Sequence, residues 1–227
     1  MRANKPMSQT TLVFDLDGTI IHSAPDLANA VNHILTALGG KALSVAQVQS
    51  MIGNGMPKLL ERGLAACGID LSRDEFQQNF EAFRDYYTSH ACVDTHCYEG
   101  AVEMLEAVRA EGYLTAICTN KLETITHVIL KTMKLEPLFD AVVGADPPKP
   151  RKPDADPVFR AIERAGGARD NAIMVGDSPA DIAAGKAAGL PTLAVSYGYT
   201  NVPPDQLGAD RLIDSLGEVL AAVKTLA

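Results

Sequence analysis

The sequence predicts an α/β protein with a doubly wound, mainly parallel, Rossmann-like sheet and a helical cap inserted after the first strand. Two observations support this prediction. Short apolar runs typical of buried strands alternate with segments of helical periodicity over most of the chain, as in βαβ units. Residues 24–95 are different, because they show helical periodicity and contain no convincing strand.

Five apolar runs, each ended by small or polar residues, are the predicted strands. They span residues 11–16, 114–119, 141–144, 172–177 and 192–196. The later runs are separated by segments with helical patterns at residues 101–112, 122–134 and 157–167, and a last helix is expected over 214–226. Strands that alternate with helices in this way favour a parallel sheet with helices on its faces.

The helical insertion has three periodic segments, at residues 25–39, 57–68 and 74–87. It leaves the sheet directly after the first strand and returns near Tyr98, so we expect it to lie over the carboxyl end of that strand. Open α/β sheets bind their ligands at this edge. We therefore predict a core domain, residues 1–22 and 97–227, and a helical cap domain, residues 23–96.

Composition excludes several classes of function. The chain has 227 residues, of which 47% are hydrophobic and 21% charged, as in an ordinary globular protein. A net charge of −8 and a pI near 5.1 oppose binding to nucleic acid, which needs a basic surface. The first ten residues lack an apolar stretch, no run approaches the ~20 residues of a membrane helix, and the four cysteines form no CxxC pair. We expect a cytoplasmic monomer or homodimer with free thiols and no membrane partner.

Two carboxylates stand at the end of the first predicted strand. In FDLDGT, Asp15 and Asp17 are two residues apart and so point toward the same region, and Gly18 permits a sharp turn. In one pocket, one carboxylate can attack as a nucleophile while the other moves a proton, and both attract a hard cation. An isolated DxD motif is also typical of a solvated turn, so the residues at the other strand ends are needed to distinguish a reaction site from such a turn.

The remaining strand ends supply the other groups of one reaction. Asp177 follows the fourth strand and Asp181 lies one helical turn later, although residues here can also simply cap that helix. Thr119 and Asn120 follow the second strand and offer hydrogen-bond donors, and Lys152 offers a cation. The carboxylates predict a Mg²⁺ site, and the whole set is what phosphoryl transfer requires.

Four motifs, DLDGT, CTNK, RKPDADP and GDSPADIAAGKAAG, resemble those of the haloacid dehalogenase-like phosphohydrolases, in an order and spacing that cover nearly the whole chain. The resemblance implies that Asp15 is the nucleophile and Asp17 the general acid and base. It also implies that Thr119 and Lys152 hold the phosphoryl group.

The same resemblance implies a magnesium ion as cofactor. Asp177 would bind the ion together with Asp15 and the main chain of Asp17, and Asp181 would lie behind these ligands. The helical insertion is similar to the cap that the family carries between its first and second motifs.

Within that family, DGTIIHSAPDLANAVN and IGNGMPKLLERGL resemble the phosphoglycolate phosphatase group, which implies 2-phosphoglycolate as substrate. Gly53, Asn54 and Gly55 precede a predicted helix, whose free amides would favour a small carboxylate, and Arg62 could add charge. A helix-joining loop with a solvated basic face explains these residues equally well. With Gly18 and Asn120, they are the predicted substrate-binding residues.

Two positions depart from that group, which usually has Asp where this chain has His22 and Pro where it has Glu99. We expect His22 to be a partly exposed side chain at the hinge into the cap. The departures put the positioning of the cap in doubt, and leave the nucleophile unaffected.

The sequence therefore predicts a Mg²⁺-dependent phosphomonoester hydrolase that forms an aspartyl-phosphate and acts on 2-phosphoglycolate. One alternative is a phosphatase or pyrophosphatase for another small phosphorylated metabolite, such as a sugar or amino-sugar phosphate. A phosphoaspartate signalling receiver is the non-enzyme alternative. A receiver would need neither the helical insertion nor Asp17.

Overall fold

A computed structural model describes residues 9–226. Its main sheet has six strands in the order β5-β4-β1-β6-β7-β8, and every neighbouring pair is parallel. The strands are β1 (Thr11–Phe14), β4 (Leu114–Cys118), β5 (Ala141–Val143), β6 (Ala172–Gly176), β7 (Thr192–Val195) and β8 (Arg211–Ile213). The predicted fold class, a parallel doubly wound sheet, is confirmed.

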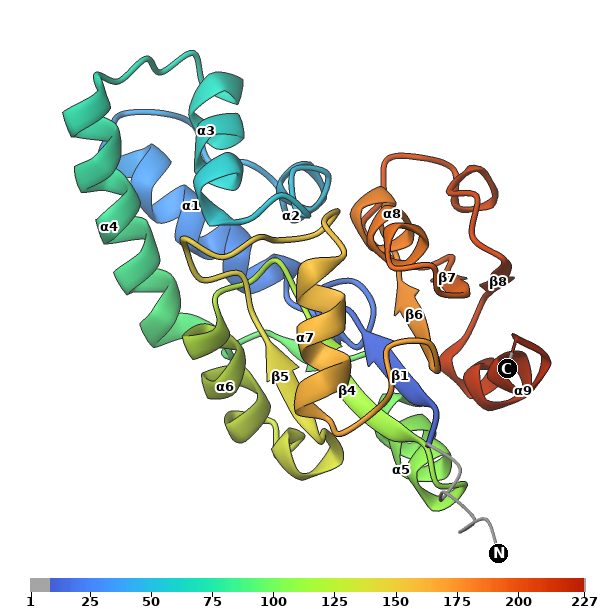
Figure 1. The fold of residues 1–227 in the computed structure, drawn as a ribbon. Helices are drawn as coiled ribbons and strands as arrows, with labels where there is room; N and C mark the ends of the chain where they lie inside the picture. The colour runs from blue at the N-terminus through green and yellow to red at the C-terminus, as the bar shows by residue number, and fades with distance from the viewer. Residues whose placement is uncertain (1–8, 227) are drawn as a thin grey trace, which may run out of the picture.

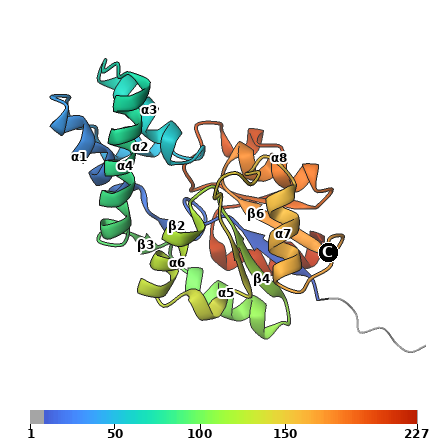
Figure 2. The same cartoon turned by 60° about the vertical axis from the view of Figure 1, so that its left-hand side comes forward.

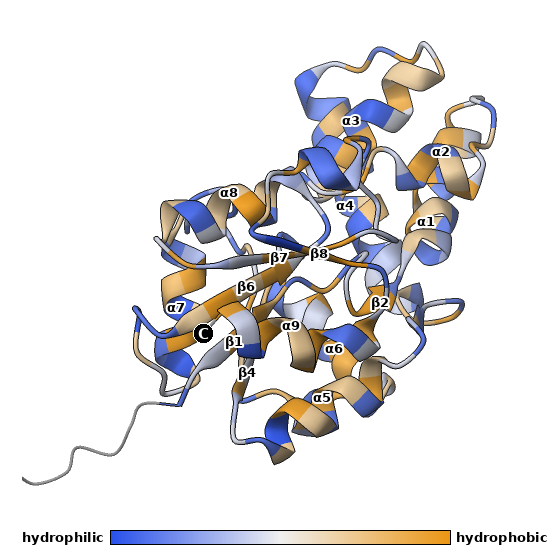
Figure 3. Cartoon of the chain, turned by 90° about the vertical axis from the view of Figure 1, so that its right-hand side faces the viewer, coloured by the Kyte–Doolittle hydropathy of each residue, from blue (hydrophilic) through white to orange (hydrophobic). Residues whose placement is uncertain are grey.

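Helices cover both faces of this sheet (Figure 1). One face carries α7 (Asp156–Arg164) and α8 (Pro179–Ala187), and the other carries α5 (Ala101–Ala110), α6 (Glu123–Thr132) and α9 (Val219–Leu226). Successive side chains of β1 point to opposite faces of the sheet. Val13 packs in the apolar cluster under α7, while Leu12 and Phe14 pack in the cluster under α5 and α9. Figure 3 shows apolar residues concentrated on the strands between the two layers.

Four helices follow the first strand, in the segment predicted to be the cap. They are α1 (Ala24–Ala37), α2 (Val45–Gln49), α3 (Met56–Ala66) and α4 (Arg73–His90), and α1 contacts the other three. Ser72 starts α4 with a capping box, in which its hydroxyl and the Glu75 carboxylate bind each other's backbone N–H. Figure 2 shows these helices grouped to one side of the sheet. None of the helices in residues 9–226 is both long and apolar enough to cross a membrane.

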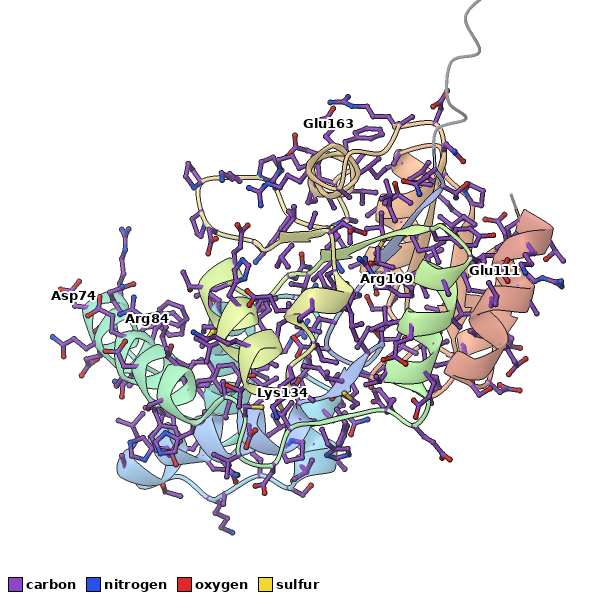
Figure 4. The ribbon with its side chains drawn as sticks, turned by 90° about the horizontal axis from the view of Figure 1, so that it is seen from below. Asp74, Arg84, Arg109, Glu111, Lys134 and Glu163 are labelled. Carbon is purple, nitrogen blue, oxygen red and sulfur yellow. The ribbon has the colours of Figure 1, made fainter. Side chains whose placement is uncertain are left out.

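Two short strands join these helices to the sheet-bearing part. Strand β2 (Ile21–His22) pairs antiparallel with β3 (His96–Cys97), so the chain leaves and returns side by side. The charged side chains of the outer surface, such as Asp74 and Arg84 on α4 and Glu163 on α7, lie toward the outside of the molecule (Figure 4). The division into a core and a cap domain, with the boundaries given above, stays a prediction.

The structure corrects the carboxyl-terminal part of the prediction. The last helix was expected over 214–226, but α9 begins at Val219, after a 3₁₀ turn at Leu216–Glu218. Residues 211–213 form the unpredicted edge strand β8, which is short and has two exposed residues, so it lacks the apolar pattern of a buried strand. The brief α2, β2 and β3 were also missed, because elements of two to five residues have no periodicity to detect.

Candidate active site

A cavity of about 500 Å³ lies between the carboxyl ends of the strands and helices α1 and α3. It brings together every predicted site residue except Gly18. These residues are Asp15, Asp17, Gly53, Asn54, Gly55, Arg62, Thr119, Asn120, Lys152, Asp177 and Asp181.

Asp15 and Lys152 form a buried ion pair on the floor of this cavity. Asp15 directly follows β1, and its N–H still bonds Val175 O at 2.9 Å, so the extended strand fixes the direction of its side chain. Lys152 Nζ lies 2.7 Å from Asp15 Oδ1, and the two side chains are 2% and 11% exposed. The same ammonium donates to Cys118 O at 2.6 Å and pairs with Asp181 Oδ1 at 2.6 Å. Burial raises the pKa of Asp15 to about 7, although Lys152 opposes the shift.

Asp177 directly follows β6 and is held on both oxygens. Thr19 Oγ1 donates to Oδ1 at 3.1 Å, and the Tyr199 N–H donates to Oδ2 at 2.6 Å. Burial raises the pKa of Asp177 well above its ordinary value, and the neighbouring carboxylates of Asp181 and Asp15 raise it further. Such a group stays charged only with a cation nearby.

The two oxygens of Asp181 have different neighbours, the capping residue Ser178 and the ammonium of Lys152. Its Oδ2 accepts from the N–H and the hydroxyl of Ser178, at 2.9 and 2.7 Å, which caps the start of α8. Its Oδ1 faces Lys152. The capping role expected at this motif and a place beside the other carboxylates therefore occur together.

The donor set fits a divalent cation. One oxygen each of Asp15, Asp177 and Asp181 lie within 4.8 Å of one another. Lys152 is the one ammonium that contacts this group among the described residues, so three buried carboxylates face a single positive charge. A divalent ion would neutralise the remaining two charges, and carboxylate oxygens are the ligands that Mg²⁺ prefers.

The Asp17 carboxylate lines the same cavity but is held by groups outside this cluster. Lys121 Nζ donates to both of its oxygens at 2.9 Å, and the Ser23 hydroxyl donates to Oδ1 in a short hydrogen bond. Any contact of Asp17 with a metal would therefore come from its main chain. Sequence analysis missed Lys121, although it stands in the CTNK motif.

Lys121 joins Asp17 to the helices above the cavity. Its side chain is 3% exposed, and its Nζ lies 4.9 Å from the centre of the Tyr87 ring on α4. Burial lowers the pKa of Lys121, but the charge of Asp17, its hydrogen bonds to Lys121 and the adjacent Tyr87 together raise it overall. The ammonium is therefore charged and held in place.

Thr119 and Asn120 follow β4 as predicted. The Thr119 N–H continues the ladder by bonding Val143 O at 3.0 Å, which places the hydroxyl at the cavity floor. Asn120 Nδ2 donates to Gly53 O and to Lys152 O, each at 3.1 Å. Asn120 thus links the sheet edge to the loop before α3.

That loop, residues 50–55, is held by side chains from the sheet-bearing part of the chain. Besides Asn120, Arg151 donates to Asn54 O at 3.1 Å, and Asn201 donates to Ser50 O at 2.7 Å. All three contacts end on main-chain carbonyls. The loop therefore closes over the strand ends in this conformation.

Arg62, expected at the substrate, has partners within its own helical region. Its Nη1 donates to Met51 O at 2.6 Å and its Nη2 to Asn54 Oδ1 at 2.7 Å. Gly55 directly precedes α3 as its N-cap with a φ of +82°, and a Cβ there would lie 3.1 Å from Arg151 Nη1. Arg62 lines the cavity and at the same time shapes the loop.

Gly18, also predicted to bind substrate, does not line the cavity. Its φ is +90°, and a Cβ at this position would lie 2.5 Å from Asp177 Oδ2. Gly18 thus allows the turn after β1 to pack directly against Asp177.

His22 lies on β2, where the chain passes from the sheet to helices α1–α4, and its side chain is partly exposed, as sequence analysis expected. Its Nδ1 is 3.1 Å from Tyr199 Oη, and burial together with the adjacent His96 lowers the pKa of His22. The Tyr199 hydroxyl also accepts the N–H groups of Ser23 and Ala24 at 2.7 and 3.1 Å. Tyr199, which no motif predicted, therefore connects the start of α1 to Asp177.

Comparison with known proteins decides the family. The sequence profile of the haloacid dehalogenase-like hydrolases matches residues 12–195, which include all four motifs. The chain belongs to this family. A signalling receiver, the non-enzyme alternative, is thereby set aside.

Similar proteins agree with this assignment. A phosphoglycolate phosphatase from Caulobacter vibrioides is 38% identical over 97% of this chain and 93% of its own length. One from Cereibacter sphaeroides is 40% identical over 86% and 89%. The crystal structure of a predicted phosphoglycolate phosphatase from Haemophilus somnus, 30% identical, superposes with a TM-score of 0.89 and covers 96% of this chain and 100% of that one. The predicted enzyme class, a phosphatase of the haloacid dehalogenase-like family, is confirmed.

Proposed function

We propose that this enzyme is a Mg²⁺-dependent phosphatase that hydrolyses 2-phosphoglycolate to glycolate and phosphate through a phosphorylated Asp15. The observation that carries the proposal is the meeting of Asp15, Thr119, Lys152 and Asp177 in one cavity, where three of them directly follow parallel strands and Lys152 comes from the loop between β5 and α7.

The first step is transfer of the phosphoryl group. A carboxylate oxygen of Asp15 attacks phosphorus, the bond from phosphorus to the ester oxygen breaks, and Asp17 gives its proton to the departing glycolate oxygen. Lys152 lies 2.7 Å from the nucleophile, where its charge stabilises the transferring group, and Thr119 offers a hydroxyl to the same group.

The second step is hydrolysis of the acyl phosphate. Asp17, now a carboxylate, takes a proton from water while the water oxygen attacks phosphorus, and the bond to Asp15 breaks. Lys121 holds both oxygens of Asp17 at 2.9 Å, which orients the carboxylate for both proton transfers.

Mg²⁺ would be held by Asp15, Asp177 and the main chain of Asp17, with Asp181 behind them. When bound, it supplies positive charge to the phosphoryl oxygens and to the buried carboxylates. Thr19 and the Tyr199 N–H orient Asp177 for this role.

The choice of 2-phosphoglycolate rests on the named relatives together with the cavity itself. The cavity holds about 500 Å³ and is closed on one side by the loop 50–55, which suits a small metabolite. Arg62 and Lys121 line it as well as Lys152, so a second anionic group would find positive charge.

The test is a steady-state comparison of phosphorylated metabolites with Mg²⁺. We expect kcat/KM for 2-phosphoglycolate to exceed that for glucose 6-phosphate, glucosamine 6-phosphate and pyrophosphate by at least about tenfold, since a charge-assisted contact contributes roughly this much. A sugar phosphate or pyrophosphate turned over faster than 2-phosphoglycolate would replace the proposed substrate.

A further inference from the structure

We propose that Lys121 is a specificity-determining residue, which binds the carboxylate of the substrate beside the ester oxygen that leaves. This inference rests on the proposed function and assigns the group that recognises 2-phosphoglycolate. Sequence reasoning had given this role to Arg62 and the residues 53–55.

Three cationic side chains line the cavity among the described residues: Arg62, Lys121 and Lys152. Lys152 Nζ donates to Asp15 Oδ1 and Cys118 O and forms an ion pair with Asp181 Oδ1, all within 2.7 Å. Its charge acts on Asp15 and on the phosphoryl group, so Lys152 does not bind the carboxylate of the substrate as well.

Arg62 already donates hydrogen bonds within its own helical region. Both of its terminal nitrogens donate to the helical region itself, to Met51 O and Asn54 Oδ1. To bind substrate through these nitrogens it would have to release the loop that closes the cavity. Its contacts therefore favour a structural role in shaping the loop.

Lys121 is the remaining cationic side chain of the cavity, and its ammonium can bind a carboxylate. Its ammonium uses two N–H groups on the Asp17 oxygens, and the hydroxyl of the neighbouring Tyr87 makes no hydrogen bond among the described residues, so a third N–H can take another acceptor. Because the side chain is only 3% exposed, water screens its charge little and a carboxylate there would be bound strongly.

The position follows from the reaction. Asp17 must come within hydrogen-bond distance of the leaving ester oxygen, about 3 Å, to give it a proton. Lys121 Nζ lies 2.9 Å from both Asp17 oxygens. In 2-phosphoglycolate the carboxylate carbon is two bonds from that ester oxygen, so a substrate held by Asp17 brings its carboxylate within reach of Lys121.

The experiment compares two substrates of similar size that differ in charge. 2-Phosphoglycolate carries the carboxylate, whereas 2-hydroxyethyl phosphate carries a neutral hydroxyl at the corresponding place. The quantity measured is the ratio of their kcat/KM values. Any loss from poorer orientation of Asp17 affects both substrates and cancels in this ratio.

Lys121→Gln keeps hydrogen-bonding capacity and removes the charge, so we expect its ratio to fall roughly ten- to a hundredfold below that of the wild type. Lys121→Arg restores the charge and should recover part of this ratio. The matched control is Arg62→Ala, which removes the other candidate cation and should leave the ratio within about threefold of wild type.

Each outcome separates the hypotheses. A wild-type ratio near one would overturn both the substrate and the role of Lys121. A high wild-type ratio that persists in folded Lys121→Gln, checked by circular dichroism, would overturn the role of Lys121 alone. If Lys121→Gln does not fold, Arg62→Ala decides, because a tenfold fall in its ratio would place the carboxylate on Arg62.

Discussion

Gly18→Ala should impair catalysis far more than it impairs folding. A Cβ at Gly18 would lie 2.5 Å from Asp177 Oδ2, and the backbone there has a φ of +90°. Asp177 cannot simply move away, because it is buried, both oxygens are hydrogen-bonded, and Gly198 also packs against it so closely that a Cβ there would lie 2.1 Å from Asp177 Cβ.

Two effects of different size follow. An alanine at this φ costs about 1–2 kcal/mol, which lowers Tm by about 2–8 °C in a chain of this length. Relieving the contact from 2.5 Å to between 3.0 and 3.4 Å displaces the proposed metal ligand by about 0.5–0.9 Å. Displacements near 1 Å can cost about a hundredfold in rate, so we expect kcat to fall roughly ten- to a hundredfold.

Gly166→Ala provides the matched control. Its φ of +84° is nearly the same, but no atom lies within 4 Å of the added Cβ. Both variants should lose the stability that the positive φ costs, with a further loss in Gly18→Ala from the contact with Asp177, while only Gly18→Ala should lose activity and bind Mg²⁺ more weakly by titration calorimetry. Equal kcat and equal Mg²⁺ affinity in the two variants would refute the view that Gly18 positions Asp177.

Three further outcomes are expected. Asp15→Asn should abolish turnover and leave the fold intact, because an amide does not attack phosphorus; near-normal turnover of the folded variant would remove the covalent mechanism. EDTA should silence the enzyme, Mg²⁺ should restore it and excess Ca²⁺ should inhibit, since Ca²⁺ takes more ligands at longer distances; full activity after chelation, verified by elemental analysis, would contradict the metal assignment. In EDTA, Tm should fall as pH rises from about 4 to about 7, because a buried carboxyl with a raised pKa keeps its proton in the folded protein after the unfolded chain has lost it. Asp15→Asn should weaken this dependence, and a Tm that rises over the same range would be inconsistent with it.

The parts of the site that follow strands were accessible from sequence. Asp15, Thr119 and Asp177 each directly follow a buried apolar run, and parallel strands bring such positions to one edge. Local pattern and chain order were therefore sufficient to place them together.

Other residues had no such signal. Tyr199 lies in a loop, and its link to Asp177 depends on how that loop folds back over the strand ends. The partners of Arg62 depend on the conformation of the loop 50–55, which no periodicity describes. Lys121 stood in a recognised motif, but its pairing with Asp17 spans 104 positions in the chain and needs the assembled sheet. Contacts of this kind follow from tertiary packing.

The pairing of β2 with β3 has a consequence for how such an enzyme can change. Because Ile21 lies opposite Cys97 and His22 opposite His96, the chain departs for helices α1–α4 and comes back at a single point. A different group of helices whose ends lie equally close could be spliced in there without altering the strand order or the residues at the strand ends. The helices that cover the cavity and the phosphoryl chemistry at the strand ends can thus diverge independently during evolution, and a protein engineer can exchange the helices while keeping the strand ends.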